Sequence, residues 1–211
     1  MKDLSDKIKQ KYSKIDVLLN NAGGANKTKQ ITTEGLEKTF ATNQMNYFVL
    51  STELLEIISE SNDGRIVNVA SNAHIGAEVD YENINSEKSF SAWTSYCVSK
   101  LMNIMFTYQL SSIQDKVSVN VLHPGFVDTN IAGNEGNFIK YIVKLGAKMF
   151  ARTVDSGADS SIYLSTSDEV QNVSGKYFFK CKEIKSSRAS YNKEDWQKVW
   201  DLCNEYKIKL I

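Results

Sequence analysis

Two kinds of segment alternate along the chain when its apolar and polar positions are compared. Short runs rich in apolar residues occupy 15–19, 64–71 and 117–122, and each ends in small or polar residues. Runs of this kind are typical of parallel strands that are buried on both faces. A further run at 176–179 predicts a last strand near the end of the chain.

Longer segments between these runs predict helices at 2–13, 33–59, 95–113, 136–150, 155–165 and 192–206. We expect the first helix to carry Leu4, Ile8 and Tyr12 on its apolar side, and Thr32 or Thr33 to cap the second. The expected core residues of the second helix are Leu36, Phe40, Phe48, Leu54, Leu55 and Ile58. Strands that alternate with helices predict one α/β domain over 1–211, with a parallel sheet covered on both faces.

Composition narrows the class of protein. The chain has 211 residues with 25 basic and 25 acidic side chains, and this zero net charge argues against a nucleic-acid binder. Its three cysteines lack the spacing of metal ligands, so we expect reduced thiols and no metal site. No apolar stretch is long enough to cross a bilayer, and the polar first residues do not resemble a secretory signal. We therefore expect a cytoplasmic protein.

Tyr96 and Lys100 carry the candidate chemistry. They lie four residues apart in a predicted helix and therefore share one face. An ammonium group beside a phenol lowers the phenol pKa from about 10, which allows proton transfer near neutral pH. Such pairs are also common on solvated helix faces. The segments 20–23 and 124–129 and the residue Ser71 follow predicted strands, and in parallel sheets such carboxyl ends form the site.

Five motifs occur in one order: 16–23 (DVLLNNAG), Asn43, 66–71 (IVNVAS), Tyr96-x-x-x-Lys100 and 123–129 (HPGFVDT). Together they resemble the short-chain dehydrogenases/reductases, and the resemblance covers nearly the whole chain. The long gap between Ser71 and Tyr96, the His-Pro-Gly turn and the tail at 173–178 are similar to the retinol dehydrogenase-like branch. The resemblance implies a partial Rossmann-type doubly wound parallel sheet, and an oxidoreductase that interconverts an alcohol and a carbonyl compound, with a lipophilic substrate as one option.

The resemblance also implies roles for four side chains. Tyr96 would be the general acid or base, and Lys100 would lower the Tyr96 pKa and bind the nicotinamide ribose. Ser71 would hold the substrate oxygen, and Asn43 would bind a water of a proton relay. Without the resemblance, we would interpret Asn43 as an ordinary polar residue of a helix, and Ser71 equally well as the cap of a turn.

The implied cofactor is NAD(P)(H), with NADP(H) favoured by the family. Besides Tyr96 and Lys100, the residues implied to contact it are Asn20, Asn21, Ala22, Gly23, Pro124, Gly125, Val127 and Thr129. We interpret His123 as strand-end structure and His74 as a loop residue.

Three interpretations of the apolar segment 138–150 remain open: a packed helix, a cover over a lipophilic substrate, or a helix on a membrane surface. The family further implies a homo-oligomer built through the helices at 33–59 and 95–113. A native N-terminal anchor would instead place the protein at the surface of the endoplasmic reticulum.

The chain departs from the family at its beginning. It lacks the Gly-rich turn that receives the pyrophosphate, so roughly 70–90 residues, including the first strands of the sheet, are expected to be missing. We expect the strand at 15–19 to form an exposed sheet edge, and the 211-residue chain to bind dinucleotide weakly. It is either a fragment or incomplete gene model of an active enzyme, or a truncated interaction module without catalysis.

Overall fold

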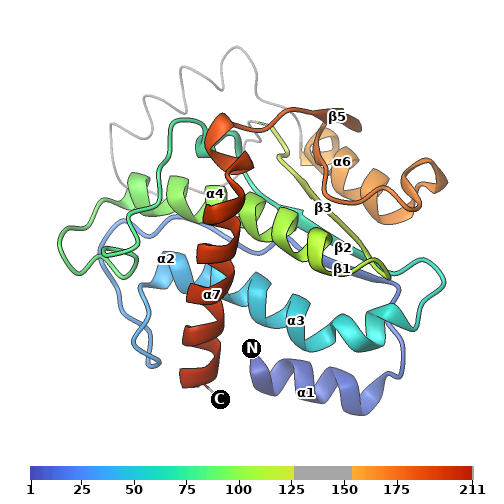
Figure 1. Cartoon of the computed structure of the whole chain (residues 1–211), viewed down its shortest axis with the longest axis horizontal. Helices are drawn as coiled ribbons and strands as arrows, with labels where there is room; N and C mark the ends of the chain where they lie inside the picture. The colour runs from blue at the N-terminus through green and yellow to red at the C-terminus, as the bar shows by residue number, and fades with distance from the viewer. Residues whose placement is uncertain (126–153, 211) are drawn as a thin grey trace.

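The computed structural model describes residues 1–125 and 154–210 (Figure 1). Its strands are β1 (Val17–Asn20), β2 (Arg65–Val69), β3 (Ser118–Leu122), β4 (Tyr177–Phe179) and β5 (Lys182–Ile184). Its α-helices are α1 (Lys2–Lys11), α2 (Lys38–Phe40), α3 (Asn46–Ser59), α4 (Ala92–Ile113), α6 (Val154–Thr166) and α7 (Lys193–Leu210). Shorter helical turns are the π-helical η1 (Ala41–Met45) and the 3₁₀ turns η2 (Asn72–His74), η4 (Asp168–Val170) and η5 (Arg188–Tyr191).

The strands form one sheet in the order β1-β2-β3-β4-β5. The first four are parallel, so their carboxyl ends lie along one edge, and β5 runs antiparallel to β4. All four predicted strands are confirmed. β1 lies at the edge of the sheet, as expected, and its Leu19 is 42% exposed. The prediction missed β5, because the turn before it is made by Lys180 and Cys181 at positive φ and carries no glycine or asparagine signal.

Helices cover both faces of the sheet, which confirms the predicted α/β class. On one face, Ile66 and Val119 of the central strands pack with α3, α4 and α7 in the largest buried apolar cluster. On the other face, Val67 and Leu122 pack against Leu164 of α6. Helix α7 packs across α4 and carries the end of the chain back over this core (Figure 1).

The helix predicted at 33–59 is wrong in its start and in its continuity. Gly35 adopts a φ of 83° in a turn, so the helix begins only at Lys38. Glu37, not Thr32 or Thr33, is the cap: its carboxylate accepts from the main-chain N–H groups of the second and third helical residues. The helix then widens into η1 before α3. The predicted core residues of this segment are buried, except that Leu55 is only partly buried.

The remaining helices agree with the pattern in part. Ile8 of α1 packs against the core, but Leu4 is 45% and Tyr12 48% exposed, because α1 docks on α3 mainly through Ser5 and Ile8. Helices α6 and α7 occupy the segments predicted at 155–165 and 192–206. The segment predicted at 136–150 lies outside the described residues. Across 1–125 and 154–210, no helix combines the length and apolarity that a membrane span needs.

Candidate active site

The four predicted catalytic residues come from three places in the chain. Asn43 lies in η1, Ser71 is the second residue after β2, and Tyr96 and Lys100 lie on α4. The Lys100 Nζ is 5.9 Å from the centre of the Tyr96 ring, and the Ser71 side chain is a hydrogen-bond partner of Tyr96. The fold therefore brings together groups from three separate segments of the chain, at η1, after β2 and on α4.

Tyr96 is 9% exposed near the beginning of α4. Burial raises the pKa of its hydroxyl, which is the opposite of the lowering by Lys100 that we predicted, and the hydrogen bond with Ser71 opposes that rise. The phenol therefore keeps its proton at neutral pH, which is the state that a general acid needs.

Lys100 is 3% exposed and points back toward the end of β2. Its Nζ donates to the Val69 carbonyl oxygen at 2.8 Å and lies 5.5 Å from the centre of the Tyr47 ring. Burial lowers the pKa of Lys100 to about 7, and no carboxylate of the described residues counteracts this. An ammonium pKa this close to neutral is typical of functional sites.

Asn43 links the loop after β1 to α4. Its Oδ1 accepts from the Gly24 N–H and its Nδ2 donates to the Gly24 carbonyl, both at 2.9 Å. Nδ2 also donates to the Ser99 Oγ at 2.9 Å, and that hydroxyl donates to the Tyr96 carbonyl at 2.7 Å. The π-helical turn places Asn43 in this position, and such turns are frequent at functional sites.

Gly23 brings the main chain close to these groups. A Cβ atom at this position would lie 2.9 Å from the Asn43 Oδ1 and 3.3 Å from the Lys100 Nζ. Asn21 and Ala22 are exposed beside it. At Gly23, the main chain thus lies next to the Lys100 ammonium group without a side chain between them.

Asn20 does not face this surface. It is buried, and its Nδ2 donates to the Ser51 Oγ at 3.0 Å and to the Asn68 Oδ1 at 2.8 Å. Asn68 in turn donates to the Thr107 Oγ1 at 2.9 Å. Asn20 therefore joins β1, β2 and two helices, and the structure gives it a structural role within the core.

The turn after β3 contains the other predicted cofactor contacts. Gly125 adopts a φ of 84° and donates its N–H to the His123 Nδ1 at 3.2 Å. The His123 ring stacks on Phe179 at 4.2 Å between ring centres, which agrees with strand-end structure. Pro124 and Gly125 are half-buried at this end of the sheet. Val127 and Thr129 lie outside the described residues.

A family model described as short chain dehydrogenase matches residues 1–139. The chain belongs to the short-chain dehydrogenase family.

Relatives of this short-chain dehydrogenase chain agree with the predicted branch. Retinol dehydrogenase 14 of Homo sapiens is 36% identical over 206 residues, which make up 96% of this chain and 61% of the relative. Polyprenol dehydrogenase of Homo sapiens is 32% identical over 202 residues, 92% of this chain and 61% of that protein. The resemblance to the retinol dehydrogenase-like branch is confirmed. The chain spans about three-fifths of the length of these relatives.

Solved structures share the fold. An uncharacterized protein from Mycobacterium paratuberculosis superposes with a TM-score of 0.71 at 23% identity, covering 97% of this chain and 71% of that one. A gluconate 5-dehydrogenase from Burkholderia cenocepacia J2315, solved with NADP and tartrate, gives a TM-score of 0.61 at 19% identity, with coverage of 83% and 66%. The Rossmann-type class predicted from the motifs is confirmed.

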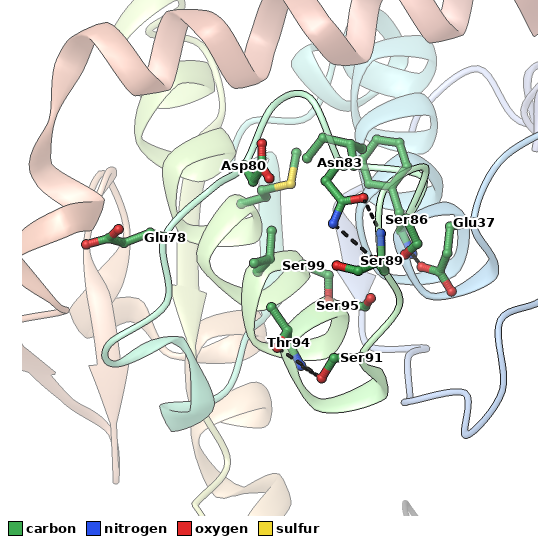
Figure 2. Close-up of a pocket in the computed structure, with 14 residues that line it drawn as sticks. Glu37, Glu78, Asp80, Asn83, Ser86, Ser89, Ser91, Thr94, Ser95 and Ser99 are labelled. Carbon is green, nitrogen blue, oxygen red and sulfur yellow. Dashed lines mark hydrogen bonds between the residues drawn. The ribbon is translucent and has the colours of Figure 1, made fainter.

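A cavity of about 120 Å³ lies on the side of α4 that carries Ser95 and Ser99, and Figure 2 shows the residues that line it. Glu37, Asp80 and Asn83 also line it. Tyr96, Lys100 and Ser71 are not among its lining residues, so this cavity is not the candidate active site.

The motifs did not point to three further residues. Ser99 bridges Asn43 and Tyr96, and the ring of Tyr47 lies against the Lys100 ammonium group. For Ser99, the only available signal was its position directly before Lys100. His74, which we interpreted as a loop residue, is 1% exposed and hydrogen-bonded on both ring nitrogens.

Proposed function

We propose that this chain forms the catalytic part of an NAD(P)-dependent oxidoreductase that interconverts an alcohol and a carbonyl compound. The observation that supports it is the convergence of Tyr96, Ser71 and Lys100 at the carboxyl end of β2. The similarity to retinol and polyprenol dehydrogenases favours a lipophilic alcohol or aldehyde as the substrate.

Tyr96 and Ser71 would act on the same substrate oxygen. In carbonyl reduction, the Tyr96 hydroxyl gives its proton to the oxygen as negative charge develops there. The Ser71 hydroxyl donates a hydrogen bond to that oxygen and stabilises the charge. In alcohol oxidation, the same two groups act in reverse: the deprotonated Tyr96 phenolate accepts the hydroxyl proton while Ser71 holds the oxygen in place.

The residues beside Tyr96 fit the nicotinamide riboside half of a dinucleotide. Gly23 leaves the space that a Cβ would fill next to Lys100, and within 1–125 and 154–210 Lys100 uses one of its three donors, on Val69. Lys100 would hold the ribose hydroxyls, and the turn at Pro124 and Gly125, followed by Val127 and Thr129, would hold the carboxamide. When bound, the nicotinamide supplies or accepts the hydride. NADP is favoured because a carbonyl reductase from chicken liver of the same fold was solved with NADPH.

Asn43 would complete the proton path. Its amide is held by Gly24 and Ser99, which fixes η1 against α4 beside Lys100. We propose that a water bound at Asn43 passes protons between Lys100 and solvent.

The test is oxidation of NADPH and NADH in the presence of a panel of lipophilic aldehydes. It compares the 211-residue chain, its Tyr96→Phe variant and the longer protein that any upstream coding sequence adds. We expect turnover in one of the two wild-type forms and a loss of about 10²–10⁴-fold in Tyr96→Phe of that form. Turnover that survives Tyr96→Phe contradicts the assignment of Tyr96. If neither form turns over, a non-catalytic interaction module becomes the better interpretation.

A further inference from the structure

His74 occupies a buried position between Ser71 and the C-terminal part of the chain. Its side chain is 1% exposed, although the sequence around it is polar and turn-rich. Its Nδ1 lies 2.7 Å from the Ser71 carbonyl oxygen, and its Nε2 lies 2.9 Å from the main-chain nitrogen of Ser187. The ring also packs edge-to-face on Tyr177, with 5.3 Å between ring centres.

These two partners determine the form of the imidazole. The Ser71 carbonyl can only accept, so Nδ1 must carry a proton. The Ser187 N–H can only donate, so Nε2 must be free of one. His74 is therefore the neutral Nδ1–H tautomer, and burial agrees with this because it lowers the His74 pKa.

The partner on the C-terminal side is itself held in place. Ser187 lies directly before η5, and its neighbour Ser186 bonds to the Tyr108 hydroxyl of α4 at 2.8 Å. The Trp196 Nε1 of α7 donates to the Ser190 carbonyl at 2.6 Å. The Ser187 N–H is thus a fixed donor, and it orients the imidazole by donating to its Nε2.

Ser71 has few other restraints on its carbonyl side. The same carbonyl accepts a longer bond, of 3.2 Å, from the His74 main-chain N–H, and the Ser71 Oγ accepts from the Ala73 N–H at 3.2 Å. The bond from Nδ1 is therefore the shortest of these three bonds, and it holds the Ser71 carbonyl in place next to the hydroxyl that lies beside Tyr96.

We propose that His74 is a positioning residue, which holds Ser71 for catalysis by donating from Nδ1 to its carbonyl while the Ser187 N–H fixes the tautomer. The inference rests on the proposed function, because Ser71 is the group that binds the substrate oxygen. It also couples the segment 186–191 to the catalytic serine through a single side chain.

Three substitutions separate the two hydrogen bonds. His74→Asn keeps an N–H near the Nδ1 position and loses the acceptor for Ser187. His74→Gln places an acceptor near the Nε2 position and loses the donor to Ser71. His74→Phe keeps a ring against Tyr177 and loses both bonds.

Kinetics on the wild-type form that shows turnover give the first readout. We expect kcat of His74→Asn to stay within about threefold of wild type, and kcat of His74→Gln and His74→Phe to fall by about 10–100-fold, with the KM for cofactor little changed. A merely structural role predicts instead that losses follow thermal stability, so melting temperatures are measured on all three. Equal kcat in His74→Asn and His74→Gln overturns the proposal, even where His74→Phe does not fold.

Nuclear magnetic resonance provides a readout that does not depend on turnover. The chain has two histidines, so its imidazole ¹⁵N spectrum contains two rings, and His74→Asn assigns them. We expect the Nδ1–H tautomer for His74, and a Ser71 carbonyl ¹³C shift that moves in His74→Gln and His74→Phe but not in His74→Asn. An Nε2–H tautomer, an imidazolium at pH 7 or an unmoved carbonyl shift overturns the proposal. Absence of turnover in every wild-type form overturns the proposed function instead, and leaves these spectra to decide on His74.

Discussion

Two regions of the molecule use buried or half-buried lysines in opposite ways. At the junction of α1, α3 and α7, the Glu53 carboxylate is bridged by Lys207 at 2.6 Å, Lys9 at 3.1 Å and Lys2 at 3.6 Å. These ammonium groups, chiefly Lys207 through its hydrogen bond, lower the Glu53 pKa to about 2. At the candidate active site, Lys100 is more deeply buried, and among the described residues its ammonium group meets one carbonyl oxygen and two aromatic rings.

The two regions therefore differ in their effect on the free energy of folding. Matched charges at the helix junction favour the folded state and hold three helices together. Burial of Lys100 without a carboxylate opposes folding, because a charge that loses its hydration without gaining a counter-charge raises the free energy of the folded state. Strongly perturbed groups of this kind cluster at functional sites, and this supports the role that we propose for Lys100 beside Tyr96 and Ser71.

Lys100→Met tests this contrast most strongly. The substitution keeps an unbranched side chain of similar length and removes the amine. We expect turnover to fall by about 100-fold or more, because the group that we propose to orient the cofactor and relay protons is lost. The free energy of unfolding at pH 7 should rise by about 1–2 kcal/mol, as measured by urea denaturation. A variant that is both inactive and less stable than wild type would show that Lys100 is structural.

The pH dependence of stability tests the lowered pKa of Lys100. The Lys100 pKa is about 7 in the folded chain against 10.5 for the free side chain. Between these values the unfolded state binds more protons, so the wild-type free energy of unfolding rises with pH, by about 1 kcal/mol per pH unit. Comparing urea denaturation of wild type and Lys100→Met from pH 7 to 10 isolates this contribution. Parallel curves for the two proteins contradict the lowered pKa.

Glu53→Gln tests the other region. Because the folded pKa is depressed to about 2 from 4.5, the contribution of Glu53 is fully present above pH 4.5 and is lost as the pH falls through 2. We expect the variant to lose about 1–2 kcal/mol at pH 7, a value reduced for partial solvent exposure, and to approach wild type in acid. Glu56→Gln, at an exposed position of the same helix, is the control and should change stability by less than about 0.5 kcal/mol.

Sequence patterns predicted those features that depend on neighbouring residues. The strands followed from short apolar runs, and Tyr96 and Lys100 share a face because they lie one helical turn apart. The start of α2 was missed because Glu37 caps it from within the segment, after the turn at Gly35. The η1 turn has no sequence signature that distinguishes it from an ordinary helix.

Contacts between distant residues could not be predicted in this way. Ser187 lies 113 residues after His74, and Ser99 lies 56 residues after Asn43, so no local pattern joins either pair. The resemblance implied that Asn20 supports the cofactor, and its partners Ser51 and Asn68, which are 31 and 48 residues away, place its side chain in the core. The family motifs indicated the candidate site, and the fold was needed to show which side chains position its residues.

Gly23→Ala, in the loop beside Lys100, should give the smallest effect on turnover and stability. Its new Cβ would lie 2.9 Å from the Asn43 Oδ1 and 3.3 Å from the Lys100 Nζ, so the amide or the ammonium group must shift by a few tenths of an ångström. We expect turnover to fall by about tenfold, with a stability loss below about 1 kcal/mol, because side-chain ends yield more easily than main chain. Gly24→Ala is the matched control, since a Cβ there meets nothing within 4 Å and its main-chain bonds to Asn43 persist. Equal turnover of the two variants would show that the close approach at Gly23 does not position Lys100.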